Sequence, residues 1–418
     1  MPGPDDGADR RPDGGENGAG VPGATDAGDD QDTGDDRNAR DVVDPVNLGD
    51  EAGGVGPPDD ADLGRYQPIG SGPEFDLTVD PPQFWGTPRR KPLCMVALGG
   101  NAIRPPDSGG TFEEQRAAVA HSAEQVVEVM RAGYKVVLTH GNGPQVGALL
   151  LQQEGGEPPA QPLEVCGAMS QGQIGYMLAQ QMTRALEREW RHVPVACVLT
   201  QSIIEPDDPA LEDPSKPVGP YVDAAKAAEM REAGMTVERV RETGDRDYRR
   251  VVPSPEPTGI VEEVPVKRLI DQRDLVICGG GGGVPVARER GEVTGYDAVV
   301  DKDLLTGVIG HTLDANYLLI LTAEDGVYLD YGTPDQRRVD RATAGEMREH
   351  LEAGEFPPGS MGPKVRAACR FVEAESRRER RAVIAALDDA LAALEGEAGT
   401  VIHEAGAGDP AAPPDEPV

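Results

Sequence analysis

Apolar residues gather, from about residue 91 onward, into short runs that alternate with helical patterns. The run 92–98 predicts a strand that ends in a glycine pair. After it, Thr111 and Glu114 have the spacing of a capping box ahead of an amphipathic stretch, which leads to a second apolar run at 135–139. This succession predicts one β-α-β unit.

The same alternation recurs through the rest of the chain. It predicts helices from about 170, near 297–309, from 361 and from 388, and strands at 193–199, 275–278, 317–321 and 382–386. Alternation of this kind is typical of an α/β fold, a three-layer αβα sandwich with an open, mainly parallel sheet. Ligands bind such sheets at the carboxyl ends of the strands, so we expect the chemistry in the loops there.

Three segments depart from this pattern. Residues 1–88 are rich in Gly, Pro and Asp with few large apolar side chains, so we expect a disordered acidic extension, either a solubilising or interaction tail or an artefact of the assigned gene start. Residues 204–257 are dominated by proline and charge, which predicts a small subdomain inserted into a catalytic domain spanning 89–405. The remainder, 406–418, is expected to be a disordered tail.

The charge balance narrows the choice of partners. The chain carries 40 basic and 74 acidic residues, a formal net charge of -34, which opposes both nucleic acids and anionic membranes. No stretch approaches the roughly 20 apolar residues of a membrane span and no signal peptide is evident, so we expect a cytoplasmic protein without membrane or nucleic-acid partners. The five scattered cysteines lack metal-ligand spacing and are expected to be reduced core residues.

Lysine is scarce, with seven lysines against 33 arginines. Codon bias in a GC-rich genome would favour arginine, whereas a high-salt cytoplasm would select an acidic surface. Because codon bias does not explain the acid excess, we favour a halophilic source. Where arginine is the rule, a retained lysine suggests a need for a compact point charge, and Lys216, Lys302 and Lys364 all lie among glycine, proline or aspartate residues. Each could also be incidental.

Three glycine clusters follow predicted strands: Gly99-Gly100-Asn101, Gly141-Asn142-Gly143, and the run 279–283 with Gly280 and Gly281. Glycines let backbone N–H groups approach an anion, so the clusters predict phosphate or carboxylate binding, although one alone could be a tight turn. No Walker A loop is present, and the spacing after Gly141 is wrong for a dinucleotide fingerprint, which leaves NAD binding a weak alternative.

Histidine and serine patterns exclude two further classes of enzyme. No HExxH pair and no GxSxG elbow occurs, so metallohydrolase and serine hydrolase functions have no support. His140, beside Gly141, is expected to orient its loop rather than to catalyse.

Taken together, the motifs closely resemble those of carbamate kinase, in the family's order, over about 92–402. They are ALGGNA at 97–102, THGNGPQVG at 139–147, SQGQIGY at 170–176, KPVGPY at 216–221, VVPSP at 251–255, DKDL at 301–304 and GSMGPK at 359–364. The resemblance implies the amino-acid kinase fold with a small protruding subdomain, a homodimer, ATP or ADP and carbamate or carbamoyl phosphate as substrates, and Mg²⁺ held through the nucleotide phosphates rather than by the protein.

The resemblance also implies residue roles. The transferred phosphoryl group would be cradled by Gly99, Gly100 and Asn101, and carbamate would lie near Gly141, Asn142 and Gly143. Lys302 and Lys364 would neutralise phosphoryl charge, Asp303 would hold the lysines, and Lys216 would reach in from the subdomain. The nucleotide base would lie near Asp325, Val327 and Tyr328.

Two departures from the family pattern stand out, Ala323 where Asp is common and Ser215 where Thr is usual. Carbamate already carries a nucleophilic oxygen, so positioning and preorganised cations suffice without a general base. The expected direction is ATP formation in arginine fermentation. Alternatives are another amino-acid kinase, such as an acetylglutamate or nucleoside-monophosphate kinase, and a non-catalytic nucleotide-binding regulator of the same fold.

Overall fold

The computed structural model describes residues 91–105, 108–154, 159–189, 192–240, 244–272, 274–356, 359–376 and 378–406. The predicted extension 1–88 and the predicted tail beyond residue 406 lie outside the described residues.

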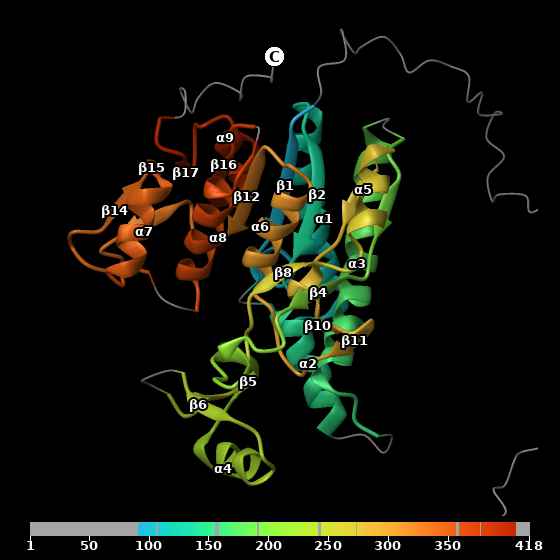
Figure 1. The fold of residues 1–418 in the computed structure, drawn as a ribbon, viewed down its shortest axis with the longest axis vertical. Helices are drawn as coiled ribbons and strands as arrows, with labels where there is room; N and C mark the ends of the chain where they lie inside the picture. Colours follow the sequence, from blue (N-terminus) through green and yellow to red (C-terminus); the bar gives the residue numbers. More distant parts are fainter. Residues whose placement is uncertain are drawn as a thin grey trace, which may run out of the picture. The chain divides into compact units, whose positions relative to one another are not determined.

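The main sheet has eight strands in the order β15-β17-β16-β12-β1-β2-β9-β3 (Figure 1). Its pairs are parallel except β16 with β17, so the prediction of a mainly parallel sheet is confirmed. The strands are β1 (Leu93–Leu98), β2 (Lys135–His140), β3 (Val195–Cys197), β9 (Leu275–Ile277), β12 (Tyr317–Thr322), β15 (Arg341–Thr343), β16 (Arg381–Ala386) and β17 (Thr400–His403).

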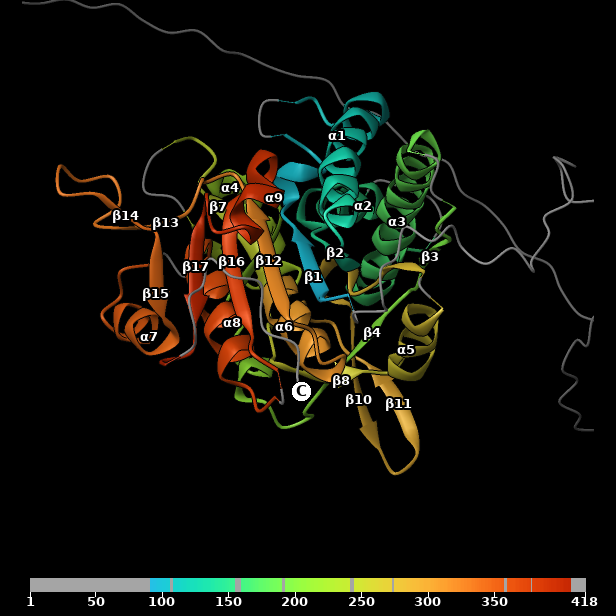
Figure 2. The same cartoon turned by 90° about the horizontal axis from the view of Figure 1, so that it is seen from above.

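Helices cover both faces of this sheet. Along β1 every side chain is buried, with Met95 and Ala97 in one core and Val96 and Leu98 in the other, as the alternation of a strand between two covered faces requires. Figure 2 shows the two layers edge-on. One contains α5 (Glu263–Asp271), α6 (Lys302–Thr312), α7 (Ala344–Glu352) and α8 (Met361–Glu373), and the other α1 (Phe112–Arg131), α3 (Leu163–Arg188) and α9 (Ala390–Leu394). The predicted three-layer sandwich is therefore confirmed.

Sequence signals predicted the start of helix α1 correctly but not the starts of α3 and α6. The capping box forms at α1, where Thr111 Oγ1 accepts from Glu114 N at 3.3 Å and Glu114 accepts from Thr111 N at 2.8 Å. Helix α3 starts at Leu163 rather than near 170, because the Asp297 carboxylate accepts the Leu163 N–H at 2.9 Å. The helix predicted near 297–309 begins only at Lys302, because Asp301 is its N-cap and residues 297–301 belong to no helix or strand.

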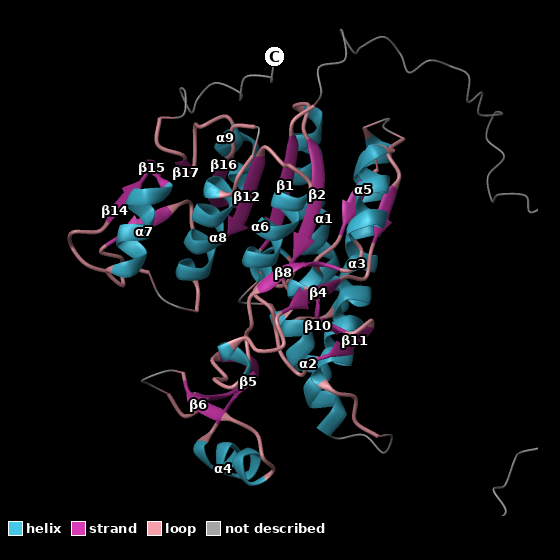
Figure 3. Cartoon of the chain, viewed as in Figure 1, coloured by secondary structure: helices cyan, strands magenta, loops and turns pink. Residues whose placement is uncertain are grey.

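A second sheet of four strands, which the sequence did not predict, has the order β11-β10-β4-β8. Its strands are β4 (Gln201–Ile204), β8 (Pro257–Ile260), β10 (Val284–Glu289) and β11 (Glu292–Gly295). Between β4 and β8 the chain forms an antiparallel sheet of order β5-β7-β6, called here the inserted sheet, together with α4 (Ala224–Glu232) (Figure 3). Its strands are β5 (Lys216–Val222), β6 (Val237–Arg239) and β7 (Tyr248–Val252).

The remaining elements are short or lie beside the loops. They are α2 (Gly143–Glu154), the pair β13 (Val327–Leu329) and β14 (Arg337–Val339), and the 3₁₀ turns Gly100–Ala102, Pro209–Leu211, Gly280–Gly282 and Leu387–Asp389. All five cysteines are free and four are buried, but Cys197 is exposed because β3 is an edge strand, which corrects its expected core position. Within the described residues, no helix combines the length and apolar character that crossing a membrane requires.

Candidate functional site

The three glycine clusters meet at one edge of the main sheet. They follow the carboxyl ends of β1, β2 and β9, which are adjacent in the sheet. Their backbones touch, because a Cβ added at Gly141 would lie 3.3 Å from the amide nitrogen of Gly100. Gly281, with φ +64°, packs so closely on the side-chain amide of Asn142 that an added Cβ would collide with it. The clusters therefore form one continuous surface of backbone groups.

The Asn142 side chain is committed to holding this surface together. It is buried, and its Nδ2 donates to Ser170 Oγ on α3 at 2.8 Å. Ser170 Oγ in turn donates to the Gly167 carbonyl at 2.6 Å. Sequence analysis gave Ser170 no role of its own. The amide of Asn142 thus ties the second glycine cluster to α3 through one of its two N–H donors.

Two lysines converge on one buried carboxylate at the same edge. Lys302 Nζ, at the start of α6, lies 2.6 Å from Asp303 Oδ1, and Lys364 Nζ, in the first turn of α8, lies 2.9 Å from Asp303 Oδ2. The Asp303 side chain is 4% exposed, whereas those of Lys302 and Lys364 are 12% and 16% exposed. The carboxylate is therefore buried beneath two cations that keep some access to the surface.

Burial and the neighbouring opposite charge shift the pKa values of Asp303, Lys302 and Lys364 in opposite directions. Burial favours the neutral acid of Asp303, but Lys302 and Lys364 outweigh it and hold the pKa of that carboxyl well below its usual range. Burial lowers the pKa of the Lys302 ammonium despite the neighbouring Asp303, whereas for Lys364 the attraction of Asp303 outweighs burial and raises its pKa. Asp303 is therefore an anion that holds two cations, and with both lysines protonated the group keeps one surplus positive charge.

A third lysine arrives from the inserted sheet. Lys216 Nζ, at the first residue of β5, lies 2.6 Å from Asp301 Oδ2. Asp301 is also the N-cap of α6, where its Oδ1 accepts from the backbone N–H groups of Asp303 at 2.9 Å and Leu304 at 3.3 Å. Sequence analysis missed Asp301 as a site residue, although an aspartate immediately before a helix is a recognisable cap signal.

The His140 ring packs against the second and third glycine clusters. Its ring is buried, and a Cβ added at Gly280 would collide with it. Burial is the main reason that the pKa of His140 falls to about 4, and the charge of Lys302 adds to the effect. Its Nδ1 lies 3.0 Å from the Gly141 carbonyl oxygen. A neutral, packed imidazole between two glycine clusters fits an orienting role.

The residues expected near the nucleotide base lie after β12, with Asp325 in the loop that leads to β13 and Val327 and Tyr328 in β13 itself. Tyr328 donates its hydroxyl to Asp325 Oδ1 at 2.8 Å. Val327 is fully buried and its N–H donates to Thr400 Oγ1 at 2.7 Å, so neither its side chain nor its N–H is available to a base. Ala323 is exposed on this loop. Proximity of Asp325, Val327 and Tyr328 to a nucleotide base stays a prediction.

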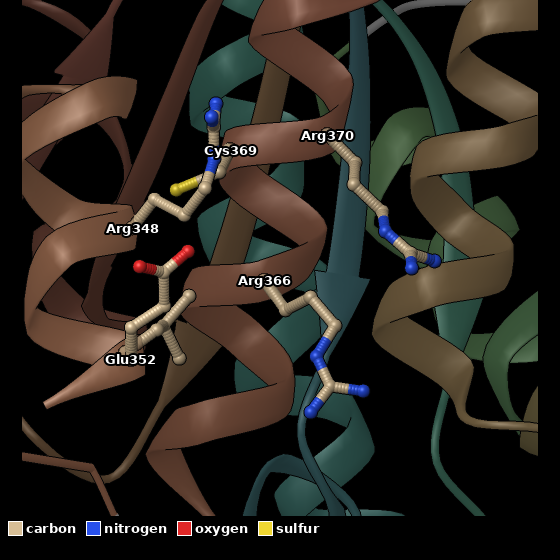
Figure 4. Close-up of a pocket in the computed structure, with 6 residues that line it drawn as sticks. Arg348, Glu352, Arg366, Cys369 and Arg370 are labelled. Atoms are coloured by element: carbon tan, nitrogen blue, oxygen red, sulfur yellow. The ribbon is translucent and has the colours of Figure 1, made fainter. Parts of the chain in front are cut away.

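A separate pocket of about 350 Å³ lies between α7 and α8 (Figure 4). Its lining residues are Arg348, Leu351, Glu352, Arg366, Cys369 and Arg370. Arg370 is paired with Glu256 through two contacts of 2.8 and 2.9 Å, and Arg348 is paired with Glu373. Lys364 does not line it although it is on α8. The pocket is thus distinct from the lysine cluster, and two of its three arginines already have carboxylate partners.

Comparison with known proteins identifies the family. The model of the Amino acid kinase family matches residues 92–385. A carbamate kinase of Thermococcus kodakarensis is 46% identical over 314 residues, which cover 74% of this chain and 98% of the relative. A carbamate kinase of Halobacterium salinarum is 43% identical over 309 residues, 74% of this chain and 97% of the relative.

Comparison with solved structures also finds carbamate kinases. The carbamate kinase of Giardia lamblia bound to AMP-PNP matches with a TM-score of 0.70 and 41% identity, covering 75% of this chain and 99% of that one. The residues that the family model matches, 92–385, include the three glycine clusters and Lys216, Lys302 and Lys364. The chain therefore belongs to the amino acid kinase family and, within it, to the carbamate kinases.

Proposed function

We propose that this chain transfers a phosphoryl group reversibly between carbamoyl phosphate and ADP, with carbamate and ATP as the other pair. The observation that carries the proposal is the convergence of Lys302 and Lys364 on Asp303 beside three glycine clusters. This arrangement offers backbone N–H groups and cations to a phosphoryl group, which are the groups that phosphoryl transfer requires.

The reaction needs alignment more than acid or base chemistry. In the ATP-forming direction the O–P bond of carbamoyl phosphate breaks, carbamate leaves with the electron pair, and a β-phosphate oxygen of ADP forms the new O–P bond. Both oxygens are already anionic, so no proton has to be removed. The neutral, buried His140 is consistent with such a mechanism, in which Lys302 and Lys364 offset the charge of the transferred group.

We assign the glycine clusters to the two ends of this transfer. Gly99, Gly100, Asn101, Gly280 and Gly281 would cradle phosphoryl oxygens. Gly141, Asn142 and Gly143 would contact carbamate. The hydrogen bond to Ser170 uses one of the two N–H donors of the Asn142 side-chain amide, so the carbamate contact would come from the backbone of this cluster and from the remaining amide donor.

Mg²⁺ fits this site only as a partner of the nucleotide. All four carboxylate oxygens of Asp301 and Asp303 accept hydrogen bonds from lysine side chains or backbone N–H groups. Across the parts of the chain that the structure describes, no group of three His, Cys, Asp or Glu side chains could hold a metal ion. Mg²⁺ prefers phosphate oxygens and water, so it would enter with ADP or ATP and neutralise phosphate charge.

Further proposals concern the protein's setting. Met169 and Tyr176 are 43% and 59% exposed and lie seven residues apart on α3, an apolar stripe that supports a homodimer.

The net charge of -34 and the scarcity of lysine support a cytoplasmic enzyme of a halophile. Carbamoyl phosphate as a phosphoryl donor to ADP is the chemistry of ATP formation in arginine fermentation.

An ADP phosphorylation assay with carbamoyl phosphate tests the central proposal. We expect Mg²⁺-dependent ATP formation, and no comparable turnover of ATP with N-acetylglutamate or a nucleoside monophosphate. Turnover of one of those acceptors instead would identify another amino-acid kinase. ADP binding without any turnover would identify a regulator that keeps the fold.

A further inference from the structure

The segment 297–301, between β11 and α6, contacts the inserted sheet, which also packs on α2 through Val146, Val218 and Val252. Three contacts join this segment to the inserted sheet or to the chain just after it, and each uses a different residue there. They are Arg250 Nη2 to Asp297 Oδ2 at 3.7 Å, Val299 N to the Pro253 carbonyl at 3.0 Å, and Lys216 Nζ to Asp301 Oδ2 at 2.6 Å. The segment leads directly into Lys302 and Asp303.

The other side of this segment packs on a glycine cluster. A Cβ added at Gly282, where φ is +92°, would collide with the carbonyl of Val300. Residues 297–301 therefore lie between the inserted sheet and the run 279–283. Their position relates the inserted sheet to the backbone surface where we place phosphoryl oxygens.

Asp301 divides its carboxylate between these two parts of the molecule. Oδ1 caps α6, and Oδ2 accepts from Lys216, which lies 85 residues earlier in the chain. The Asp301 side chain is only 12% exposed, whereas that of Lys216 is 31% exposed. A lysine ammonium has three N–H donors, so Lys216 can keep its bond to Asp301 and still donate to a ligand.

We propose that Asp301 is a positioning residue that holds the Lys216 ammonium beside the lysine cluster before substrate arrives. The inference rests on the proposed function and deepens it. A free lysine side chain would have to be ordered during the reaction, at a cost in rotamer entropy, whereas a cation already in place stabilises developing charge without that reorganisation. Asp301 contacts Lys216 directly and attracts Lys302 and Lys364 only as a minor neighbouring charge, so its loss should matter most while Lys216 is present.

Asp301→Asn separates the ion pair from the helix cap. Asparagine caps a helix about as well as aspartate, so α6 keeps its N-terminus while Lys216 loses its counter-charge. We expect kcat for ATP formation to fall about 10- to 100-fold with KM for ADP changed less than about threefold, because the lost interaction acts mainly in the transition state. The matched control is Asp223→Asn, the same change at the N-cap of α4, which should keep the unmodified kcat.

A double-mutant cycle tests whether the effect passes through Lys216. Lys216→Met keeps most of the side-chain length without the charge. In that background Asp301→Asn should cause no more than about a twofold further loss of kcat. An equal fold-loss in both backgrounds, or an unmodified kcat in Asp301→Asn alone, would overturn the proposal.

Hydrogen exchange of the ligand-free protein supplies a readout independent of activity. Asp301→Asn should speed exchange of the amides in β5, and Asp223→Asn should leave those amides unaffected, because Lys216 forms its ion pair with Asp301 and not with Asp223. Unchanged exchange in β5 would also contradict the proposal. Absence of ATP formation by the unmodified protein would refute the proposed function instead, while the exchange experiment would still decide the role of Asp301.

Discussion

Lys364 on α8 donates to the carboxylate of Asp303 on α6 at 2.9 Å, although 61 residues separate them in the sequence. Lys302 occupies the other oxygen of the same carboxylate. Asp303 thereby determines the spacing of two cations that arise from different helices. Both cations lie in the first turns of their helices, and under the proposed function this spacing would preorganise charge for phosphoryl transfer.

Lys302→Ala should lower kcat for ATP formation by about 100- to 1000-fold, because it removes one preorganised donor aimed at transition-state charge. The control is Lys267→Ala, which removes an exposed lysine that pairs with Glu263 on α5. Initial rates with saturating carbamoyl phosphate and ADP, together with circular dichroism to verify folding, would measure the effect. A folded Lys302→Ala protein with nearly unmodified kcat would contradict the assignment.

Gly281→Ala should destabilise the protein more than Gly291→Ala. Both residues have positive φ, +64° and +90°, which costs a non-glycine residue about 1–2 kcal/mol. Only Gly281 also faces the Asn142 amide, whereas nothing lies within 4 Å of a Cβ at Gly291. We expect a further loss of about 1–3 kcal/mol in the free energy of unfolding, typical of overpacking. Urea unfolding of the two variants measures the difference, and equal stabilities would show that the contact with Asn142 is unimportant.

His140 should make stability fall as the solution is acidified. Its pKa is about 4 in the folded protein, below the ordinary 6.5, because burial disfavours the charged ring. Between these two pH values the unfolded chain binds a proton that the folded protein does not, so the free energy of unfolding decreases as pH falls from about 6.5 to about 4, by up to about 3 kcal/mol.

His140→Gln removes this titration and serves as the comparison. The difference in unfolding free energy between the unmodified protein and His140→Gln should shrink or reverse as pH falls through that window. Asp303 does not interfere, because its lowered pKa makes its stabilising contribution disappear only at pH values below the ordinary aspartate range. Parallel pH profiles for the two proteins would show that His140 is not held neutral by the fold.

Activity and thermal stability should rise with KCl and then level off. The net charge of -34 produces repulsion among surface carboxylates, and the Debye length shortens from about 10 Å at 0.1 M to about 3 Å at 1 M salt. Salt also screens attraction between lysines and phosphate, but Lys302 and Lys364 are largely buried and are screened less. Melting temperatures and kcat measured across this range test the expectation. Full stability in dilute buffer, with only inhibition by salt, would favour codon bias as the reason for the scarce lysines.

Structural features that depend on residues close together in the sequence were predictable from the sequence. The capping box of Thr111 and Glu114, the buried strand after Pro92 and the glycine clusters at strand ends all express local backbone preferences and periodicity. Three such clusters after strands of a parallel sheet were enough to predict an anion site at the carboxyl edge. The resemblance of the motifs to a known family then supplied residue roles that periodicity alone could not.

Only the tertiary structure decided which of these groups meet. The pairing of Lys216 with Asp301, the packing of Gly281 on Asn142 and the second sheet all depend on contacts between segments far apart in the sequence. Residues 297–301 illustrate the reason. Their composition permits a helix, but Asp297 caps α3 and Asp301 caps α6, and these long-range and boundary hydrogen bonds outweigh local propensity. The sequence by itself therefore determined the main alternation of strands and helices and the kinds of group at the site. Packing of the elements determined the second sheet and the distances within the site, because each distance depends on the path of the whole intervening chain.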